Sequence, residues 1–229
     1  MEKPEENKNC YASSTQREVL LHLIANPIIE ESFFLTGGTA LSVFYLHHRV
    51  SNDLDLFALE PLELSDIDFW VKRIWLDGAA KIKEGPNFLS FLIKEVRVDF
   101  VIDPLSIREE RQKFRFENGR HLMIDTVDNI ASNKFCTIVS RVEPKDFIDF
   151  YYMRKIFTKS TLGQIYNDAR KKEALFDDPP TAAFQIEEGL MFLKENQAVM
   201  PNLMIDFNER DFFTFYNDVV RWLYGLVKI

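Results

Sequence analysis

Apolar and polar residues follow two different periods along the chain. Up to Pro104, short runs in which apolar and polar residues alternate are interspersed with runs whose apolar residues recur every three to four positions. Alternation is typical of half-buried strands, and the longer period is typical of amphipathic helices. Beyond Arg120 almost only the helical period remains. The pattern predicts an α+β protein, with an α/β domain over residues 13–118 and a helical domain over residues 119–229.

The first domain is expected to contain a mixed or antiparallel sheet with flanking helices. We predict strands over residues 33–36, 54–59, 87–94 and 95–103, the last two forming a hairpin that turns near Lys94-Glu95. We predict helices over residues 14–26, 38–47 and 66–76. The polar residues 1–12 are expected to be disordered, and the charged residues 108–120 are expected to form a loop or linker.

The second domain is expected to be helical throughout. The predicted helices cover residues 126–140, 144–157, 161–174, 181–196 and 208–227. They are separated by Pro144, Pro179-Pro180 and Pro201, because proline disfavours the interior of a helix. The aromatic run Phe147, Phe150, Tyr151 and Tyr152 is expected to belong to the core of this domain.

Charge and composition narrow the classes of partner. The chain has 229 residues, is 46% hydrophobic and carries a net charge of −8, so its overall field repels nucleic acid. A nucleic-acid partner would need a local basic patch, for which the candidates are Arg108, Arg111, Lys113, Arg115 and Arg120. Because glutamates are interleaved with them, a plain solvated loop is an equally good interpretation.

The cellular location is expected to be the cytoplasm. Cys10 and Cys136 have neither metal nor disulfide-framework spacing and suit a reducing compartment. No apolar run reaches the roughly 18 residues that a membrane span needs, and the N-terminal residues are polar, unlike a signal peptide. No membrane association is expected.

The candidate chemistry is concentrated in residues 33–57, where Asp53 and Asp55 alternate with Leu54 and Leu56. In a strand, both carboxylates leave one face while the leucines enter the core. Neighbouring carboxylates repel each other unless a cation lies between them, and Mg²⁺ binds one or two carboxylates together with water and phosphate oxygens. A lone Asp-x-Asp is more often a solvated strand edge, so these two residues alone do not establish a metal site.

A glycine pair upstream makes a functional site a better interpretation than a solvated strand edge. Gly37 and Gly38 open the predicted helix, where bare backbone N–H groups can cradle phosphate and the hydroxyl of Thr39 can donate to it. Arg49 and Ser51, just before the aspartates, are candidate phosphate-binding or supporting groups.

A third carboxylate is placed by the second strand of the hairpin. There Val96, Val98 and Phe100 face one way and Arg97 and Asp99 the other, so Asp99 is a candidate third metal ligand. Two Mg²⁺ ions about 4 Å apart can clamp the attacking and leaving oxygens of a phosphoryl transfer. Together with the glycine turn, this arrangement favours metal-dependent nucleotide chemistry.

The segment LTGGTALSVFYLHHRVSNDLDLF closely resembles the signature of the AbiEii/AbiGii-type nucleotidyltransferases, a branch of the DNA polymerase β-like nucleotidyltransferase superfamily. The later segment DNIASNKFCTIVSRVEPKDFIDFYYM is similar to the downstream pattern of that family, a helix with a lysine, an arginine, and a basic-Asp-x-x-Asp run. The resemblance covers roughly residues 33–155. It implies a polymerase β-like first domain, and many members are toxins of bacterial toxin–antitoxin or phage-defence systems.

The resemblance also implies roles for individual residues. By it, Gly37, Gly38 and Thr39 contact the triphosphate of an NTP, and Asp53 and Asp55 hold Mg²⁺. Lys134 binds phosphate or a developing charge, and Asp146 or Asp149 completes the site from the helical domain. Without the resemblance, the face that carries Asp146 and Asp149 would be interpreted as merely exposed. For Arg141 and Lys145, pairing with neighbouring acids on a solvated face is an equally good interpretation.

The activity implied is transfer of a nucleotide onto an acceptor, which for characterised relatives is tRNA. An antitoxin partner is expected by the same analogy. Two alternatives stay open: a nucleotidyltransferase that modifies a protein or a small molecule, and a catalytically silent module that binds nucleotide.

Overall fold

The computed structural model describes residues 3–156, 161–196 and 200–226. The chain divides into two compact units, Met1–Thr126 and Val127–Ile229. The first contains all the described strands and the second is helical, so the predicted α+β class is confirmed.

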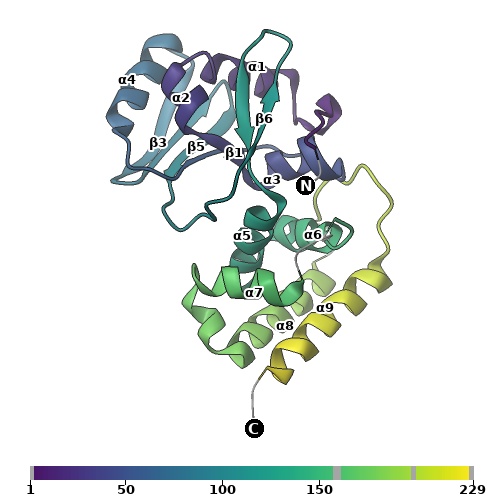
Figure 1. The fold of residues 1–229 in the computed structure, drawn as a ribbon. Coiled ribbons are helices and arrows are strands. Elements are labelled where there is room, and N and C mark those ends of the chain that lie inside the picture. The colour runs from purple at the N-terminus through teal and green to yellow at the C-terminus, as the bar shows by residue number, and fades with distance from the viewer. Residues whose placement is uncertain (1–2, 157–160, 197–199, 227–229) are drawn as a thin grey trace. The chain divides into compact units, whose positions relative to one another are not determined.

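The first unit is built on a seven-stranded sheet with the order β3-β4-β5-β2-β1-β7-β6 (Figure 1). The strands are β1 (Phe34–Thr36), β2 (Leu54–Ala58), β3 (Ala79–Gly85), β4 (Phe88–Ile93), β5 (Val96–Ile102), β6 (Gln112–Arg115) and β7 (His121–Ile124). The pairs β2–β5 and β1–β7 are parallel, and the other neighbours are antiparallel. The sheet is therefore mixed, as predicted.

Helices flank this sheet. They are η1 (Lys8–Cys10), α1 (Ser14–Leu23), α2 (Pro27–Ser32), α3 (Gly37–Leu41), the π-helical turn η2 (Ser42–Leu46) and α4 (Leu64–Ile74). In β2, Leu54, Leu56 and Ala58 are buried, whereas Asp55 and Phe57 are only half-buried. The strand thus puts its apolar side into the core and leaves the carboxylate on the less covered face.

The predicted hairpin is confirmed as β4 and β5. Its turn lies at Lys94 and Glu95, which both have positive φ angles, of 47° and 66°. Along β5, Val96, Val98 and Phe100 are buried while Arg97 is exposed and Asp99 half-buried, as the alternation predicts.

The prediction that residues 1–12 are disordered was wrong for the described residues 3–12. Cys10 is fully buried, and its carbonyl accepts a hydrogen bond from the backbone N–H of Ser51 at 2.9 Å. Tyr11 forms a parallel bridge with the same Ser51 and is also buried. This segment is held by long-range backbone pairing, which its polar composition does not reveal.

Two further predictions in the first unit were wrong. Residues 108–120 were expected to be a loop, but β6 lies within them and pairs with β7 at the edge of the sheet. The predicted boundary after residue 118 therefore falls inside the β6–β7 hairpin. The predicted helix over residues 14–26 ends at Leu23, and α2 follows it with the side chain of Asn26 capping the N–H of Ile28 at 2.9 Å.

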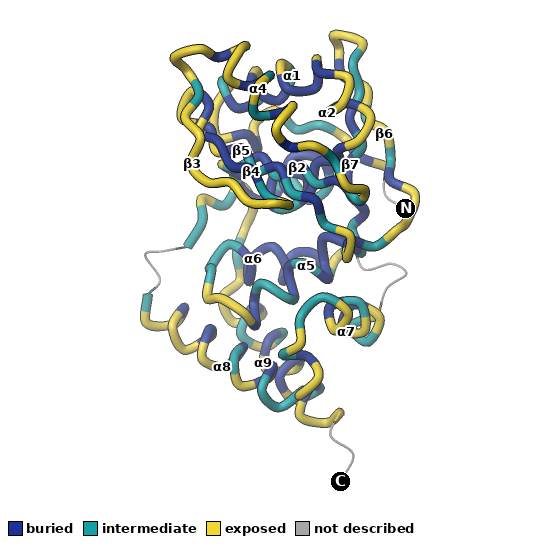
Figure 2. Tube along the Cα trace, turned by 90° about the vertical axis from the view of Figure 1, so that its left-hand side faces the viewer, coloured by how far each residue is buried: buried dark blue, intermediate teal, exposed yellow. Residues whose placement is uncertain are grey.

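Strand β3 was not predicted at all. It is an edge strand whose residues are almost all exposed, so no apolar face imposes alternation on its sequence (Figure 2). An irregularity between Lys81 and Lys83 interrupts its pairing with β4. Bulges and lysines at an edge discourage pairing with other chains.

The helices of the second unit are α5 (Val127–Ser140), α6 (Pro144–Met153), α7 (Leu162–Arg170), η3 (Ala174–Asp177), α8 (Pro179–Glu195) and α9 (Glu209–Gly225). The predicted helices are confirmed, with shifted ends. Pro144 and Pro179 begin helices, because a first-turn residue needs no N–H partner. Residues 1–2 of the predicted lead-in and residues 157 and 227, each the last of a predicted helix, lie outside the described residues.

The aromatic run of α6 lies in the core as predicted, with Phe147, Phe150, Tyr151 and Tyr152 all buried. Within the described part of the chain, no helix combines the length and the apolar character that crossing a membrane requires.

Candidate active site

The paired aspartates of the first unit lie on neighbouring parallel strands. Asp55 in β2 stands in register with Asp99 in β5, and Asp53 comes one residue before β2. Side chains in register on adjacent strands leave the sheet on the same face, as do residues two apart on one strand. Asp53, Asp55 and Asp99 are all half-buried, so they are accessible without being fully solvated.

Asp99 has partners of its own. The hydroxyl of Ser90 in β4 donates to its Oδ1, and Arg97 approaches both oxygens, with Nη2 3.0 Å from Oδ2 and Nε 3.2 Å from Oδ1. The hydrogen bond to Asp99 raises the pKa of Arg97, and the charges of Asp53 and Asp55 raise it further. The guanidinium therefore lies in the field of all three carboxylates.

The described residues contain no group of three or more His, Cys, Asp or Glu side chains arranged to hold a metal ion. The predicted set Asp53, Asp55 and Asp99 is thus assembled on one face of the sheet, but its carboxylates do not converge.

The turn after β1 requires glycine at both positions. Gly37 has a φ of +67°, and a Cβ there would overlap Oδ2 of Asp55 and lie 3.1 Å from its Cγ. A Cβ at Gly38 would overlap Nη2 of Arg49 and lie 3.1 Å from the hydroxyl oxygen of Ser51. The backbone of this turn therefore passes against the metal-ligand candidate Asp55 on one side and a buried guanidinium on the other.

Three predicted phosphate-binding candidates, Thr39, Arg49 and Ser51, make contacts at this turn. Thr39 is fully buried, and its hydroxyl lies 2.9 Å from the Ser51 hydroxyl and also bonds the backbone carbonyl of Asp53. Arg49 is buried and donates to the carbonyl of Val50 at 2.8 Å. Thr39 and Ser51 thereby connect the glycine turn to the aspartate strand.

The sequence analysis did not identify Gln16, a residue of α1 that supports the backbone of Asp53. Gln16 is fully buried, accepts from the N–H of Ala12 at 2.8 Å and donates to the carbonyl of Asp53 at 3.4 Å. The backbone of Asp53 is thus held by Gln16 as well as by Thr39. The side chain of Ser13 caps α1 by accepting from the N–H of Gln16 at 3.2 Å, but nothing in the sequence pointed from Gln16 to Asp53.

The second cluster lies between α5 and α6. The ammonium of Lys134 is 2.6 Å from Oδ1 of Asp146 and 2.7 Å from Oδ2 of Asp149, and Nη2 of Arg141 is 3.2 Å from Oδ2 of Asp146. The side chains of both aspartates are at most 1% exposed and that of Lys134 is 9% exposed. The interpretation of Asp146 and Asp149 as exposed was wrong, because Lys134 compensates their charge inside the unit.

Electrostatics keep this cluster charged. Burial alone would raise the pKa of Asp146, but the charge and hydrogen bond of Lys134, with help from Arg141, lower it below its ordinary value. Burial raises the pKa of nearby Tyr216, and the charges of Asp149 and Asp146 add to this. The Tyr216 hydroxyl is therefore neutral and donates to the carbonyl of Phe147 at 2.6 Å.

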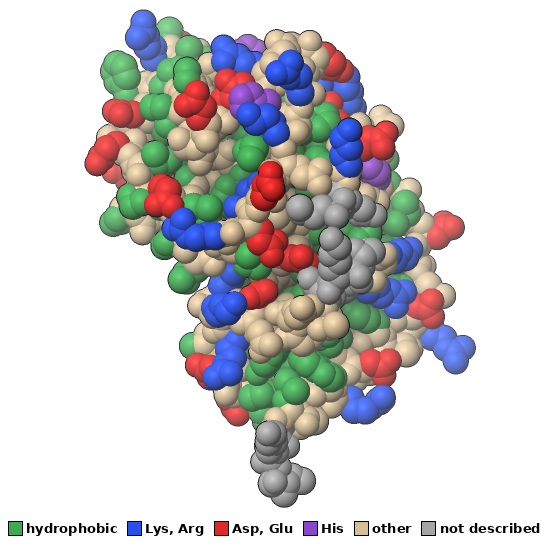
Figure 3. All heavy atoms as spheres, viewed as in Figure 1, with side chains coloured by type: hydrophobic (Ala, Val, Ile, Leu, Met, Phe, Trp, Pro, Cys, Tyr) green, Lys and Arg blue, Asp and Glu red, His purple; other side chains and the backbone are tan. Residues whose placement is uncertain are grey.

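Three of the five basic candidates between residues 108 and 120 are paired with acids. Arg111 is buried, pairs with Asp125 at 2.9 Å and stacks 3.6 Å from the ring centroid of Phe34. Arg108 pairs with Glu60 at 2.6 Å and Arg120 with Glu30 at 2.9 Å. On the visible face of the first unit, basic and acidic side chains are interspersed (Figure 3).

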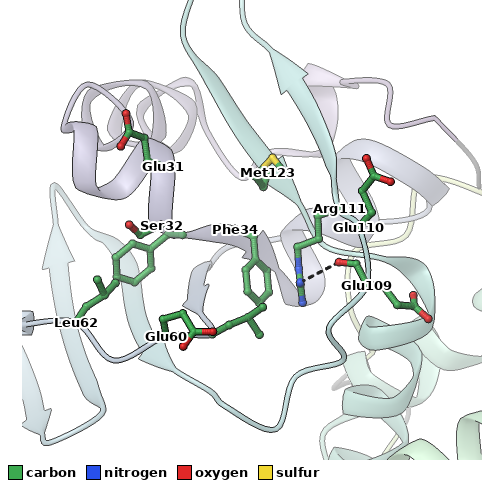
Figure 4. Close-up of a pocket in the computed structure, with 11 residues that line it drawn as sticks. Glu31, Ser32, Phe34, Glu60, Leu62, Glu109, Glu110, Arg111 and Met123 are labelled. Atoms are coloured by element: carbon green, nitrogen blue, oxygen red, sulfur yellow. Dashed lines mark hydrogen bonds between the residues drawn. The ribbon is translucent and has the colours of Figure 1, made fainter.

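A cavity of about 450 Å³ opens at the opposite end of β1 from the glycine turn. Phe34, the first residue of β1, lines it, and Arg111 there donates to the carbonyl of Glu109 at 3.5 Å (Figure 4). Its lining also contains the glutamates 31, 60, 109 and 110. Four glutamates and the buried Arg111 therefore line this cavity.

Residues 18–217 match the family described as "Nucleotidyl transferase AbiEii toxin, Type IV TA system". No curated protein matches the chain.

Solved structures share the fold at low sequence identity. MenT4, a nucleotidyltransferase toxin from Mycobacterium tuberculosis, superposes with a TM-score of 0.56 at 12% identity, covering 93% of this chain and 83% of MenT4. A candidate nucleotidyltransferase from Helicobacter pylori gives 0.55 at 16% identity, covering 95% of this chain and 100% of the other. JHP933, also from Helicobacter pylori, gives 0.51 at 17% identity, covering 96% of each chain.

Proposed function

The chain belongs to the AbiEii family of nucleotidyltransferase toxins of type IV toxin–antitoxin systems, and from this we propose a Mg²⁺-dependent transfer of a nucleoside monophosphate from an NTP to tRNA. The observation that carries the proposal is the placement of Asp55 against the Gly37 turn. A carboxylate and a bare phosphate-binding backbone are needed side by side in this reaction, and the sequence supplies glycine where any side chain would separate them.

The donor set suits the metal. Asp53 and Asp55 offer carboxylate oxygens on one face of the sheet, which is the ligand type that Mg²⁺ prefers when it is shared with phosphate. We assign Asp53 and Asp55 as metal ligands and Asp99 as a third. Bound Mg²⁺ supplies neutralisation of phosphate charge and a template that orients the reacting oxygens.

The residues of the chain provide positioning, on which nucleotidyl transfer depends. In our proposal the N–H groups of Gly37 and Gly38 bind the triphosphate, and Thr39, Arg49 and Ser51 hold this turn at a fixed distance from the aspartates. We also propose that Asp99 accepts the proton of the attacking hydroxyl.

The buried cluster of the second unit is assigned a supporting role. We propose that Lys134 provides positive charge for phosphate, while Asp146 and Asp149 keep its ammonium charged and oriented. The contacts of 2.6 and 2.7 Å support the second half of this proposal.

The acceptor is proposed as tRNA on the family resemblance, with an antitoxin as the partner of the toxin. The net charge of −8 and the pairing of Arg108 and Arg120 with acids favour the alternative, an acceptor that is a protein or a small molecule. A silent nucleotide-binding module is the third possibility, and a retained cluster of carboxylates argues against it.

A labelling experiment separates these acceptors. Each α-³²P-labelled NTP is incubated in turn with the protein, Mg²⁺ and total bacterial RNA, beside a lane without RNA and a lane with the variant Asp55→Ala. We expect label on a band of tRNA size that disappears in the variant. Label on protein alone would establish the alternative acceptor, and the absence of label from a folded protein that still binds nucleotide would contradict the transferase proposal.

A further inference from the structure

Arg97 occupies a position among the carboxylates that the proposed function does not explain. It precedes Asp99 by two residues in β5, so both side chains leave the same face of the sheet. The register pairs Leu54 with Val98 and Asp55 with Asp99, which places Arg97 level with Asp53 at the start of β2. Its guanidinium contacts both oxygens of Asp99, at 3.0 and 3.2 Å.

The surroundings of Arg97 are those of a counter-ion. Besides the hydrogen bond to Asp99, the carboxylates of Asp53 and Asp55 interact with it electrostatically. A guanidinium stays protonated throughout the physiological range, so its charge cannot be removed by loss of a proton. The arginine therefore neutralises part of the same acidic cluster to which a divalent cation is assigned.

The ion pair between Arg97 and Asp99 is also able to separate. The side chain of Arg97 is 51% exposed, whereas that of Asp99 is 14% exposed and is held by Ser90 as well. An ion pair that is half-exposed contributes little net free energy, so the flexible arginine can swing into solvent while Asp99 stays in place.

We infer that Arg97 is an internal counter-cation that competes with the divalent metal ion for Asp99 and the neighbouring aspartates. This inference rests on the proposed function, because it takes Asp99 to be a metal ligand. It explains why the three carboxylates share a face without converging: the arginine holds Asp99 until it is displaced. Metal affinity of the free protein is accordingly lower than the carboxylates alone would give.

The test measures metal binding by the full chain rather than activity. Mn²⁺ binding is followed by isothermal titration and by electron paramagnetic resonance, for wild type, Arg97→Gln and Arg97→Lys. We expect Arg97→Gln to bind Mn²⁺ about three- to tenfold more tightly, the size expected for removal of one partly screened charge. Arg97→Lys keeps the charge and is expected to stay near the wild-type affinity. Far-UV circular dichroism confirms that each variant is folded.

Arg108→Gln is the matched control. Arg108 is an exposed arginine of the same unit, 60% exposed and paired with Glu60 at 2.6 Å, and it is not near the aspartates in sequence or in the sheet. Its removal changes net charge by the same amount, so it should leave Mn²⁺ affinity unchanged. A tightening in both glutamine variants would reduce the effect to net charge and overturn the inference.

Asp55→Asn distinguishes this failure from that of the proposed function. If wild type binds Mn²⁺ and Asp55→Asn does not, the metal site stands, and an unchanged or weaker affinity in Arg97→Gln overturns only the role of Arg97. If no form of the protein binds Mn²⁺, or binding survives Asp55→Asn, the metal assignment itself is contradicted.

Discussion

Two of the aspartate–cation clusters among the described residues differ in how far the cation is buried. In the first unit, Arg97 is 51% exposed and Asp99 is 14% exposed. In the second unit, Lys134 is 9% exposed and its two aspartates are at most 1% exposed. In the first cluster the arginine side chain can move away from the aspartates into solvent. In the second cluster, movement of the lysine would leave unpaired charges in the core.

The difference assigns different physical roles to similar residues. A buried pair holds the fold together only as long as both partners are present, since removal of one leaves an uncompensated charge. A half-exposed cluster beside a glycine turn tolerates the loss of a partner and is free to bind ligands. Loss of activity on mutation therefore means something different in each unit, and stability must be measured alongside it.

The largest effect is expected for Lys134→Met. This change leaves Asp146 and Asp149 buried without their ammonium, so we expect the second unit to lose about 3–5 kcal/mol of stability. Urea unfolding is followed by the fluorescence of Trp222, which lies in α9, in a background in which Trp70 and Trp75 of the first unit are replaced by phenylalanine. Lys171→Met is the matched control, because Lys171 pairs with Asp168 at 2.7 Å but is 73% exposed.

The control is expected to change stability by about 0.5 kcal/mol or less. Equal stability of Lys134→Met and Lys171→Met would contradict the structural role of the buried cluster, and it would leave catalysis as the reason for Lys134.

A smaller effect is expected for Gly37→Ala, which acts on the half-exposed cluster. The new Cβ displaces the carboxylate of Asp55, so nucleotide transfer should fall about 100-fold, in line with the cost of small misplacements in active sites. Gly119→Ala is the control, since Gly119 has a φ of +83° and a Cβ there meets nothing within 4 Å.

Both alanine variants carry the strain of a positive φ, about 1 kcal/mol. Their stabilities should therefore fall by similar amounts, and only Gly37→Ala should lose activity. Equal activities would show that the approach of Asp55 to the turn is irrelevant to transfer.

The smallest effect is expected for the dependence of stability on acidic pH. The pKa of Asp146 is below its ordinary value of 3.8 in the folded protein, so its contribution to stability is complete above that pH and disappears as the pH falls through the lower folded value. Between pH 5 and 2 the free energy of unfolding of the second unit should fall more steeply in wild type than in Asp146→Asn. Parallel curves would contradict the ion pair as the source of the shift.

The sequence predicted those parts of the fold that carry a periodic apolar face. Strands β2 and β5 alternate because one face is buried, β4 is a short, mostly apolar run, and α5 to α9 show helical spacing because one side is buried. Strand β3 could not be predicted, because it is exposed on both faces. The order of residues 3–12 depends on backbone pairing with Ser51, which lies forty positions away and leaves no mark on local composition.

The residues of the candidate site could be proposed from the sequence, but the contacts that they make could not. Asp53, Asp55 and Asp99 follow from spacing and alternation. Arg97 was visible on the same strand face as Asp99, but its attachment to that carboxylate depends on rotamers and on register between strands. The burial of Asp146 and Asp149 depends on a lysine from another helix, which an i, i+3 spacing cannot indicate.

The most direct test of the account is a paired measurement on Asp55→Asn: transfer of label from α-³²P-NTP, and urea unfolding of the same preparation. Because Asp55 is half-buried and isosteric with asparagine, we predict that transfer disappears while stability stays within about 0.5 kcal/mol of wild type. Transfer that persists in a folded Asp55→Asn would contradict the central claim that the half-exposed aspartates of the first unit carry the chemistry.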